Sequence, residues 1–349
     1  MDKVSVLAIT KNGIDIGLRL KEIFPTWNIF APSKFENNSI ISWYSESTTE
    51  KIEELFKKSN ALICIFSLGA VIRLIAPHLK DKKTDPAVIV IDDKINFVIS
   101  ALSGHIGGAN ELTEEIANKL GATSVITTAA DVNKTIAVDL VGREFGWKID
   151  DDSTVTKISA HMVNEEKIGV FQDAGNRNWY KNLPNNVKIF QNLEDLKNSD
   201  SKAFLIITDR KIDGEFLSKS VVYRPPSLVV GVGLHGDTTK EKIKEGITFC
   251  MDKFNLSPKS ISTLTSIKKP ADVQGLIDLG IEMNIPVEYV TRENLSEISI
   301  PNPSNIVRAF EGTPSVSEAA AIKVSGGDLV VEKQKFPPDL TIAIARRLD

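Results

Sequence analysis

One segment of the sequence combines residue types that could hold an anion. It is the run 103–110, SGHIGGAN, which stands between a predicted strand and a predicted helix. Its glycines let the backbone approach a ligand closely, and the free amides and dipole at a helix start favour a phosphate or carboxylate. It is not a P-loop, because no Gly-Lys-Ser/Thr follows. The alternative is a tight turn with His105 as a solvated loop residue, and composition favours neither.

A second glycine-rich segment matches the spacing of a dinucleotide-binding loop. Gly231, Gly233 and Gly236 follow a predicted strand and precede a predicted helix, as that motif requires. The motif also needs an acidic residue at the end of the next strand, where this chain has Ser-Ile-Lys-Lys, so a nicotinamide cofactor is disfavoured. Thr238-x-x-Glu241 fits a capping box, which gives part of the segment a structural explanation.

A third segment, 311–318 (EGTPSVSE), leads directly into a predicted helix. Ser315-x-x-Glu318 fits a capping box, and the hydroxyls of Thr313 and Ser315 could also donate hydrogen bonds to a carboxylate. On spacing alone, a well-capped helix is the favoured interpretation.

Two further places carry side chains suited to chemistry. Thr127, Thr128 and Asp131 follow a predicted strand, and the carboxyl ends of parallel strands usually face a ligand crevice. Asp131 could be a base or could orient one, although acidic turn residues are common. Arg73 lies among apolar residues of a predicted helix and could pair with a substrate carboxylate or an internal acid. The four histidines lack metal-ligand spacing, so we expect no metal centre.

The composition is that of an ordinary folded protein. The chain has 349 residues, 42% apolar and 25% charged, with a formal charge of −4. This balance argues against wholesale binding to nucleic acid or anionic membrane, so an anionic ligand must be held locally. Cys64 and Cys250 lie in separate apolar runs and predict two buried thiols in a reducing compartment. Because the N-terminus shows no cleavage pattern and no apolar run reaches about 18 residues, we expect a cytoplasmic protein.

Strand-like and helix-like segments alternate along the chain, which predicts a multi-domain α/β fold with mostly parallel sheets flanked by helices. We expect an N-terminal α/β domain over 1–135, a smaller middle α/β region over 136–225 and a C-terminal α/β domain over 226–349. The second boundary rests on Pro225-Pro226, which can continue neither a helix nor a sheet ladder.

Four local features are also predicted. A helix should cover 137–146, and the next helix should be capped by the cluster 151–153, Asp-Asp-Ser. A tight hairpin should turn at 93–94, and the last two strands, within 329–347, should form a hairpin at a sheet edge.

Taken together, these segments resemble one family closely, the cobalt-precorrin-5A hydrolases of the anaerobic cobalamin pathway. The resemblance covers nearly the whole chain, and its most specific part is SGHIGGANELT followed later by GTPSVSEAAA. It also includes SLGAVIRLIAP, VITTAADVN and the terminal TIAIAR. Members of this family look like three-part proteins, which agrees with the regions drawn above from composition.

The chain departs from the family pattern in one place. Where the family usually has Gly-x-Gly-Cys-Arg-Arg/Lys-Gly-Thr, residues 231–238 read GVGLHGDT. The cysteine and both basic residues are absent, and His235 could partly substitute for them. The dinucleotide-like glycine spacing is therefore partly an accident of this replacement.

The resemblance implies a hydrolase that opens the ring A δ-lactone of cobalt-precorrin-5A and releases the C20 fragment as acetaldehyde, giving cobalt-precorrin-5B. Such chemistry needs a positioned water, a base, donors for an oxyanion, and proton transfer from the hydroxyl that the opened lactone exposes. By residue type, His105 is the expected base and Asp131 is expected to orient its imidazole. The amides of Gly107 and Gly108, with Asn110, are the expected oxyanion or carboxylate donors.

The implied substrate is a cobalt-containing polycarboxylate tetrapyrrole, so its site should be partly apolar and rich in hydrogen-bond donors. Helix starts in the first and third regions offer such donors without raising the net charge. No cofactor is expected, and neither nucleic acid nor a membrane is an expected partner. Other enzymes of the same pathway are the further partners that the resemblance implies. The residues expected to bind the substrate are Ser67, Gly69, Arg73, Ser103, Gly104, Gly107, Gly108, Asn110, Thr127, Thr128, Gly231, Gly233, His235, Thr238, Glu311, Thr313 and Ser315.

Two other functions stay open at this point. The missing Cys-Arg-Arg/Lys segment leaves room for a non-catalytic tetrapyrrole-binding or channelling protein of the same pathway. A nicotinamide-dependent oxidoreductase rests only on the Gly-x-Gly-x-x-Gly spacing.

Overall fold

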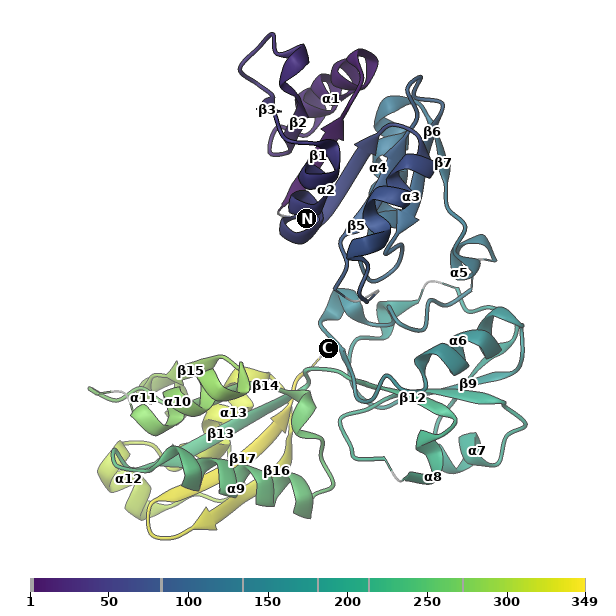
Figure 1. The fold of residues 1–349 in the computed structure, drawn as a ribbon. Helices are drawn as coiled ribbons and strands as arrows, with labels where there is room; N and C mark the ends of the chain where they lie inside the picture. The colour runs from purple at the N-terminus through teal and green to yellow at the C-terminus, as the bar shows by residue number, and fades with distance from the viewer. Residues whose placement is uncertain are drawn as a thin grey trace. The chain divides into compact units, whose positions relative to one another are not determined.

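The computed structural model describes residues 3–81, 84–133, 135–180, 182–212, 214–271 and 273–348. The chain forms two compact units, Met1–Leu140 and Val141–Asp349. The first unit holds one sheet and the second holds two (Figure 1). The predicted α/β class, with several mostly parallel sheets flanked by helices, is confirmed. No helix in the described part of the chain is long and apolar enough to cross a membrane.

The first unit is built on a seven-stranded sheet in the order β3-β2-β1-β4-β5-β6-β7. Its strands, in that order, are Ser42–Tyr44, Asn28–Pro32, Val4–Ala8, Ala61–Ile65, Ala87–Ile91, Phe97–Leu102 and Thr123–Val125. Neighbouring strands are parallel except β5 and β6, which are antiparallel and form the predicted hairpin. β6 and β7 therefore run in the opposite direction to the other five strands.

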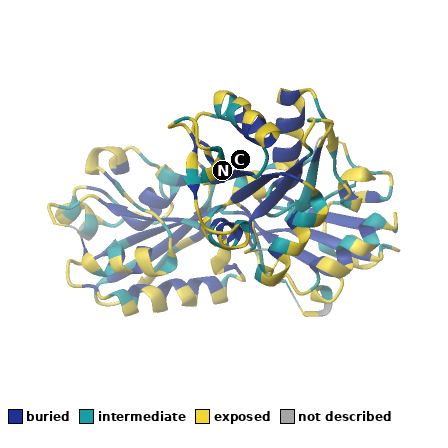
Figure 2. Ribbon diagram, turned by 45° about the horizontal axis from the view of Figure 1, so that its top comes forward, coloured by how far each residue is buried: buried dark blue, intermediate teal, exposed yellow. Residues whose placement is uncertain are grey.

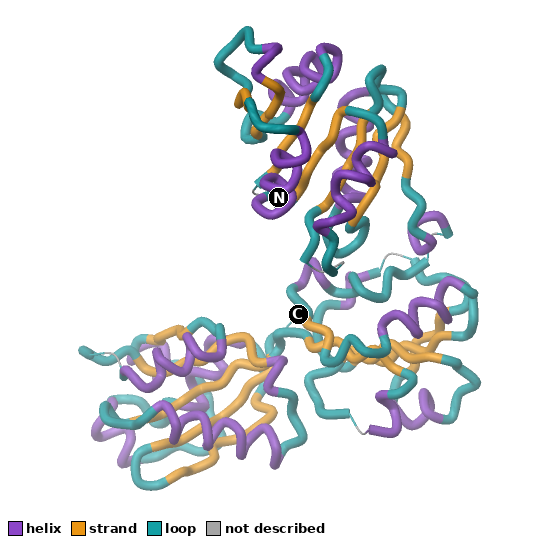
Figure 3. The backbone as a smooth tube through the Cα atoms, viewed as in Figure 1, coloured by secondary structure: helices purple, strands orange, loops and turns teal. Residues whose placement is uncertain are grey.

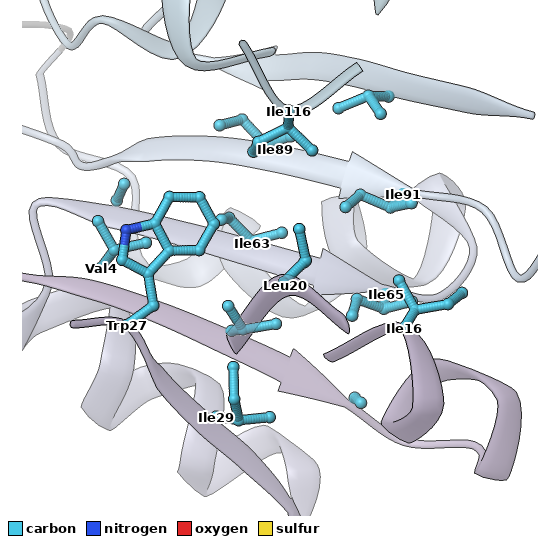
Figure 4. Packing of buried hydrophobic residues seen from close by; sticks show 14 of the residues in the cluster. Val4, Ile16, Leu20, Trp27, Ile29, Ile63, Ile65, Ile89, Ile91 and Ile116 are labelled. Atoms are coloured by element: carbon cyan, nitrogen blue, oxygen red, sulfur yellow. The ribbon is translucent and has the colours of Figure 1, made fainter. Parts of the chain in front are cut away.

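Helices cover both faces of this sheet. They are α1 (Lys11–Ile23), α2 (Thr48–Lys58), α3 (Leu68–Ile75) and α4 (Ala109–Leu120), followed by the short α5 (Ala129–Val132). Because side chains alternate along a strand, Ile63 and Ile65 of β4 pack with α1 and α4 (Figure 4), whereas Leu62 and Cys64 pack with α2 and α3. Cys64 and Cys250 are both buried and free, as predicted.

The second unit begins with a five-stranded sheet in the order β10-β9-β11-β12-β8. Its strands, in that order, are Val187–Phe190, Ile168–Gln172, Ala203–Ile207, Ser220–Arg224 and Lys148–Ile149. All pairs are parallel except β12–β8. The associated helices are α6 (Val155–Val163), α7 (Leu193–Lys197) and α8 (Gly214–Leu217).

Two predictions near the start of this unit are wrong. Residues 137–146 form turns and a single 3-10 turn, Arg143–Phe145, instead of a helix. The reason is that Gly142 and Gly146 both adopt a φ of 70°, the left-handed conformation, which ends helical geometry. The cluster at 151–153 does not cap α6, whose N-cap is Thr154 without a side-chain hydrogen bond.

The last sheet has the order β15-β14-β13-β17-β16. Its strands, in that order, are Val287–Val290, Ile261–Ile267, Leu228–Leu234, Leu340–Arg346 and Leu329–Phe336, and its helices are α9 (Lys240–Lys253), α10 (Gln274–Met283), α11 (Arg292–Ser296), α12 (Asn305–Glu311) and α13 (Ser317–Ser325). β16 and β17 form the predicted antiparallel hairpin, in which only β16 is an edge strand. In all three sheets the strands lie beside helices (Figure 3). The helices expose their outer faces, and the central strands are largely buried (Figure 2).

Helix α13 packs unusually close to the centre of this last sheet. A Cβ atom on Gly231 of β13 would lie 1.9 Å from the carbonyl oxygen of Ser317, at the start of α13. The facing residues of the helix, 319–321, are three fully buried alanines. The Gly-Val-Gly segment thus removes side chains from β13 so that a helix of small residues can contact it directly.

The two sheets of this unit are joined by a buried ion pair. Arg346, at the end of β17, donates from Nε and Nη2 to both carboxylate oxygens of Asp209, each at 2.7 Å. Asp209 follows β11 and its side chain is fully buried. Ser227, between the sheets, donates a further hydrogen bond to the same carboxylate, so this buried charge is fully paired.

We expect Gly231→Ala to destabilise the second unit by roughly 1–3 kcal/mol, because the added methyl group overpacks against helix backbone that cannot rotate away. Gly236→Ala is the matched control, since a Cβ there meets nothing within 4 Å. Calorimetry of the full chain should show one thermal transition lowered by the first substitution and none lowered by the second. Equal midpoints for both variants would contradict this account of the packing.

Candidate active site

His105 lies in the loop between β6 and α4, with a carboxylate near each of its ring nitrogens. Its Nε2 is 2.9 Å from Oδ2 of Asp131, and its Nδ1 is 3.5 Å from Oδ1 of Asp139. The imidazole is only 14% exposed, whereas the Asp131 side chain is 41% exposed. The two acids therefore fix the ring orientation, and the Asp131 side of the ring is the more open to solvent.

The same contacts determine the charge of the ring. The pKa of His105 is raised, chiefly by the hydrogen bond with Asp139, and Asp131 adds to the effect. Partial burial, which disfavours charge, opposes it but does not prevail. His105 thus stays an imidazolium, a proton donor, to higher pH than an isolated histidine.

Asn110, near the start of α4, positions Asp131. Its Oδ1 accepts a hydrogen bond from Ser100 Oγ at 2.6 Å, and its Nδ2 donates to Thr128 Oγ1 at 3.0 Å and to Asp131 Oδ2 at 2.5 Å. Asn110 is 6% exposed. Both of its side-chain hydrogens are therefore used inside the protein, one on Thr128 and one on Asp131.

The glycines of the loop have conformational roles. A Cβ on Gly104 would lie 2.6 Å from Oδ1 of Asn110, and one on Gly107 would lie 2.4 Å from Cβ of Ser103. Gly108 adopts a φ of 78° as the N-cap of α4. These glycines are needed for the turn itself, which is the alternative that composition could not exclude.

Two of the predicted oxyanion donors are also engaged within the loop. The amide of Gly108 donates to the carbonyl of His105, and the amide of Asn110 donates to that of Gly104. The Gly107 amide has no acceptor among the described residues. It is therefore the one predicted amide that is available to a substrate.

Strand direction explains which predicted residues meet. Because β6 and β7 are parallel to each other, the loop after β6 and the segment 127–131 after β7 lie at the same end of the strands. Because both run opposite to β5, that end lies beside the amino end of β5. Ser103 Oγ accordingly donates to the carbonyl of Asp85, just before β5. Ser67 and Gly69 follow β4, at the opposite end of the strands, so they do not join the cluster around His105. Arg73 is exposed on α3, without an acidic partner in the described ranges.

In the second unit, four predicted binding residues line one pocket of about 330 Å³. They are Gly233, His235, Glu311 and Ser315. The other three predicted residues of this unit do not line it. Gly231 lies under α13, while Thr238 and Thr313 are buried and hydrogen-bonded, Thr238 to the amide of His235 and Thr313 to the carbonyl of Ser315.

Both predicted capping boxes are wrong. The N-cap of α9 is Thr239, one residue after Thr238, and its hydroxyl accepts from the amide of Lys242. The N-cap of α13 is Val316, and Glu318 is fully buried instead of reaching back to the helix start. The Glu318 carboxylate accepts hydrogen bonds from the amide and side chain of Asn302 and from the amide of Lys333. It thereby connects the segment 301–304 (PNPS) and β16 to α13.

Three family models match successive parts of the chain. Family models described as cobalamin synthesis G N-terminal, cobalamin biosynthesis central region and cobalamin synthesis G C-terminus match residues 50–131, 136–225 and 228–345. A cobalt-precorrin-5A hydrolase of Priestia megaterium is 41% identical, over 98% of this chain and 94% of that protein. This chain belongs to the cobalt-precorrin-5A hydrolase family.

A second member of that family, the cobalt-precorrin-5A hydrolase of Salmonella typhimurium, is 30% identical over 95% of this chain and 94% of its own length. A solved structure of a cobalamin biosynthesis protein G homologue from Sulfolobus solfataricus is 22% identical. It covers 99% of this chain and 98% of its own, with a TM-score of 0.39.

Sequence reasoning missed Asp139 in this member of the cobalt-precorrin-5A hydrolase family. The residue falls in the segment 137–146, which the apolar spacing assigned to a helix of the middle region. The structure instead places it within the first unit, beside His105. The glycines at 142 and 146 are the only local signal against a helix there.

We expect Asp139→Asn to lower the pKa of His105, because it removes the largest interaction that favours the imidazolium. A titration of the histidine ring protons by NMR, with His105→Gln to assign the signal, measures the change directly. The other three histidines serve as internal references. An unchanged or higher pKa for His105 would show that Asp139 does not stabilise its charge.

Proposed function

We propose that this protein is a cobalt-precorrin-5A hydrolase. It opens the ring A δ-lactone of cobalt-precorrin-5A and releases the C20 fragment as acetaldehyde, leaving cobalt-precorrin-5B. The observation that carries the proposal is the His105 imidazole held between Asp131 and Asp139, since both steps need a proton donor and acceptor at one place. The 41% identity to a relative with this name supports the choice of substrate.

In the first step, water attacks the lactone carbonyl and the ring C–O bond breaks. Asp131, the more exposed acid, accepts the proton of the water, and the amide of Gly107 donates to the developing oxyanion. The leaving oxygen takes a proton from Nε2 of the His105 imidazolium. The products are a carboxyl group and a free C20 hydroxyl, with His105 now neutral.

In the second step, neutral His105 accepts the proton of the C20 hydroxyl while the bond from C20 to the macrocycle breaks. The electron pair of that bond remains on the conjugated ring, which then takes the proton from Asp131, and acetaldehyde leaves. His105 is again an imidazolium and Asp131 again a carboxylate. A histidine with a raised pKa suits this cycle because the donor form that the first step requires persists to higher pH than in an isolated histidine.

Substrate carboxylates need cations or free donors. In the first unit we propose Arg73, which is exposed, together with the exposed Thr127 at the edge of the sheet that holds His105. The cobalt ion enters as part of the substrate, and among the described residues no group of three or more His, Cys, Asp or Glu side chains could hold a metal ion.

We expect His105→Asn to lower the rate of acetaldehyde release by about 10²–10⁴-fold, the usual contribution of a proton-transfer residue. His78→Asn is the matched control, a histidine on the helical segment after α3. Acetaldehyde would be trapped during incubation with cobalt-precorrin-5A, and the corrinoid checked for the matching loss of mass. A wild-type protein that binds this substrate without releasing acetaldehyde would instead be a carrier.

The pH profile tests the protonation state in the cycle. Because the imidazolium is the donor in the first step, the rate should fall as pH rises through the pKa of His105. Asp139→Asn lowers that pKa, so the fall should move to lower pH in this variant. A profile that rises through this region, or one that Asp139→Asn leaves in place, would remove His105 from the donor role.

A further inference from the structure

The pocket in the second unit contains a polar group that lacks a partner. Ser315 is 1% exposed, lines the pocket, and its hydroxyl makes no hydrogen bond among the described residues. Leaving a buried hydroxyl unpaired costs free energy unless a ligand or water satisfies it. The hydroxyl stands immediately before α13, where the helix dipole favours a negative charge.

The charges around this hydroxyl also favour an anion. Glu311 is paired with Lys269 at 3.1 Å, and Asp339 is paired with Lys242, so both acids of the lining are neutralised. Lys335 lines the pocket, is exposed, and has no acidic partner in the part of the chain that the structure describes. Its positive charge is therefore available to a ligand.

A second lysine lies deeper. Lys333 has a side chain that is 8% exposed, and its Nζ is 4.0 Å from Oε2 of the buried Glu318. Burial lowers its pKa, and Lys335 lowers it further. A negative group placed between these two lysines would relieve their repulsion and favour the charged form of Lys333.

The mouth of the pocket is apolar. Phe310 of α12 is 82% exposed and lines it, together with Val307 of the same helix and the pair Pro337-Pro338 after β16. An aromatic ring this exposed offers a face for stacking against another conjugated ring. At about 330 Å³ the pocket is near the lower limit for ligand sites, so it suits one edge of a large molecule.

We propose that this pocket binds a carboxylate at the rim of a conjugated macrocycle, with Ser315 and Lys335 on the carboxylate and Phe310 against the ring. The proposal rests on the function proposed above for the nature of the macrocycle. It assigns to the second unit a binding site whose residues are separate from those of the His105 cluster.

The probe is uroporphyrin, a planar tetrapyrrole with acetate and propionate side chains, titrated into the full chain and followed by its fluorescence. Ser315→Ala removes the hydroxyl without leaving a partner unpaired, and Lys335→Glu reverses the charge. Lys323→Glu on α13 makes the same charge change at an exposed lysine outside the pocket lining. A cationic porphyrin of the same ring size controls for stacking alone.

We expect affinity for uroporphyrin to fall about tenfold in Ser315→Ala and more in Lys335→Glu, and to stay within about twofold of wild type in Lys323→Glu. Affinity should weaken with salt, and the cationic porphyrin should bind poorly. Phe310→Ser should weaken binding without lowering the thermal midpoint, because the ring is exposed. Failure of the wild type to bind uroporphyrin, or equal affinity in all variants, would overturn the proposal.

Binding and catalysis are separated by His105→Asn, which should bind uroporphyrin as wild type does. If the pocket variants keep wild-type kcat/KM for acetaldehyde release and wild-type affinity, the pocket proposal fails while the hydrolase function stands. If they lose affinity but the wild type releases no acetaldehyde, the hydrolase function fails while the pocket stands.

Discussion

The antiparallel pairing of β5 and β6 determines where chemistry can occur in the first unit. It reverses the last two strands of the sheet, so that the loop after β6 and the segment after β7 both lie at the amino ends of the other strands. Because β6 and β7 are parallel neighbours, His105 and Asp131 meet at that end, and Asn110 bonds to the same carboxylate oxygen of Asp131 as His105 does. Asp139 supplies the second contact of the ring and the largest part of the rise in the pKa of His105.

The second unit depends on a different constraint, the close approach of α13 to β13. Gly231 gives the helix room, and three buried alanines fill the space that remains. A helix packed this tightly brings Glu318 fully inside, where it must be satisfied by Asn302 and the backbone of β16. The PNPS and GTPS segments are thereby held at one end of the sheet, and the pocket is formed between them and the β16–β17 hairpin.

Local pattern was enough to predict the fold class, the β5–β6 hairpin and most strands and helices, because apolar periodicity reports burial directly. It misassigned what depends on tertiary contacts. The spacing of Ser315 and Glu318 fits a capping box. Glu318 is instead buried inside the unit, and the N-cap of the helix is another residue. Asp131 was expected where the carboxyl ends of all the strands meet. Because β7 runs in the reverse direction, Asp131 lies at the other end of the sheet. Asp139 was hidden in a segment whose apolar spacing resembles a helix, which the two left-handed glycines prevent.

The charge of the His105 cluster limits what it can do for an anionic substrate. With the imidazolium flanked by two carboxylates the three groups sum to −1, so the cluster does not attract carboxylates by itself. This arrangement is suited to proton transfer, since the two acids orient the ring and raise the pKa of His105, so that it keeps its proton to higher pH than an isolated histidine. Attraction must then come from other cations, and Arg73 and Lys335, one in each unit, have no acidic partner among the residues that the structure describes. A chain with a formal charge of −4 can therefore bind a polycarboxylate, provided that the groups which bind it and the groups which transfer protons are different residues.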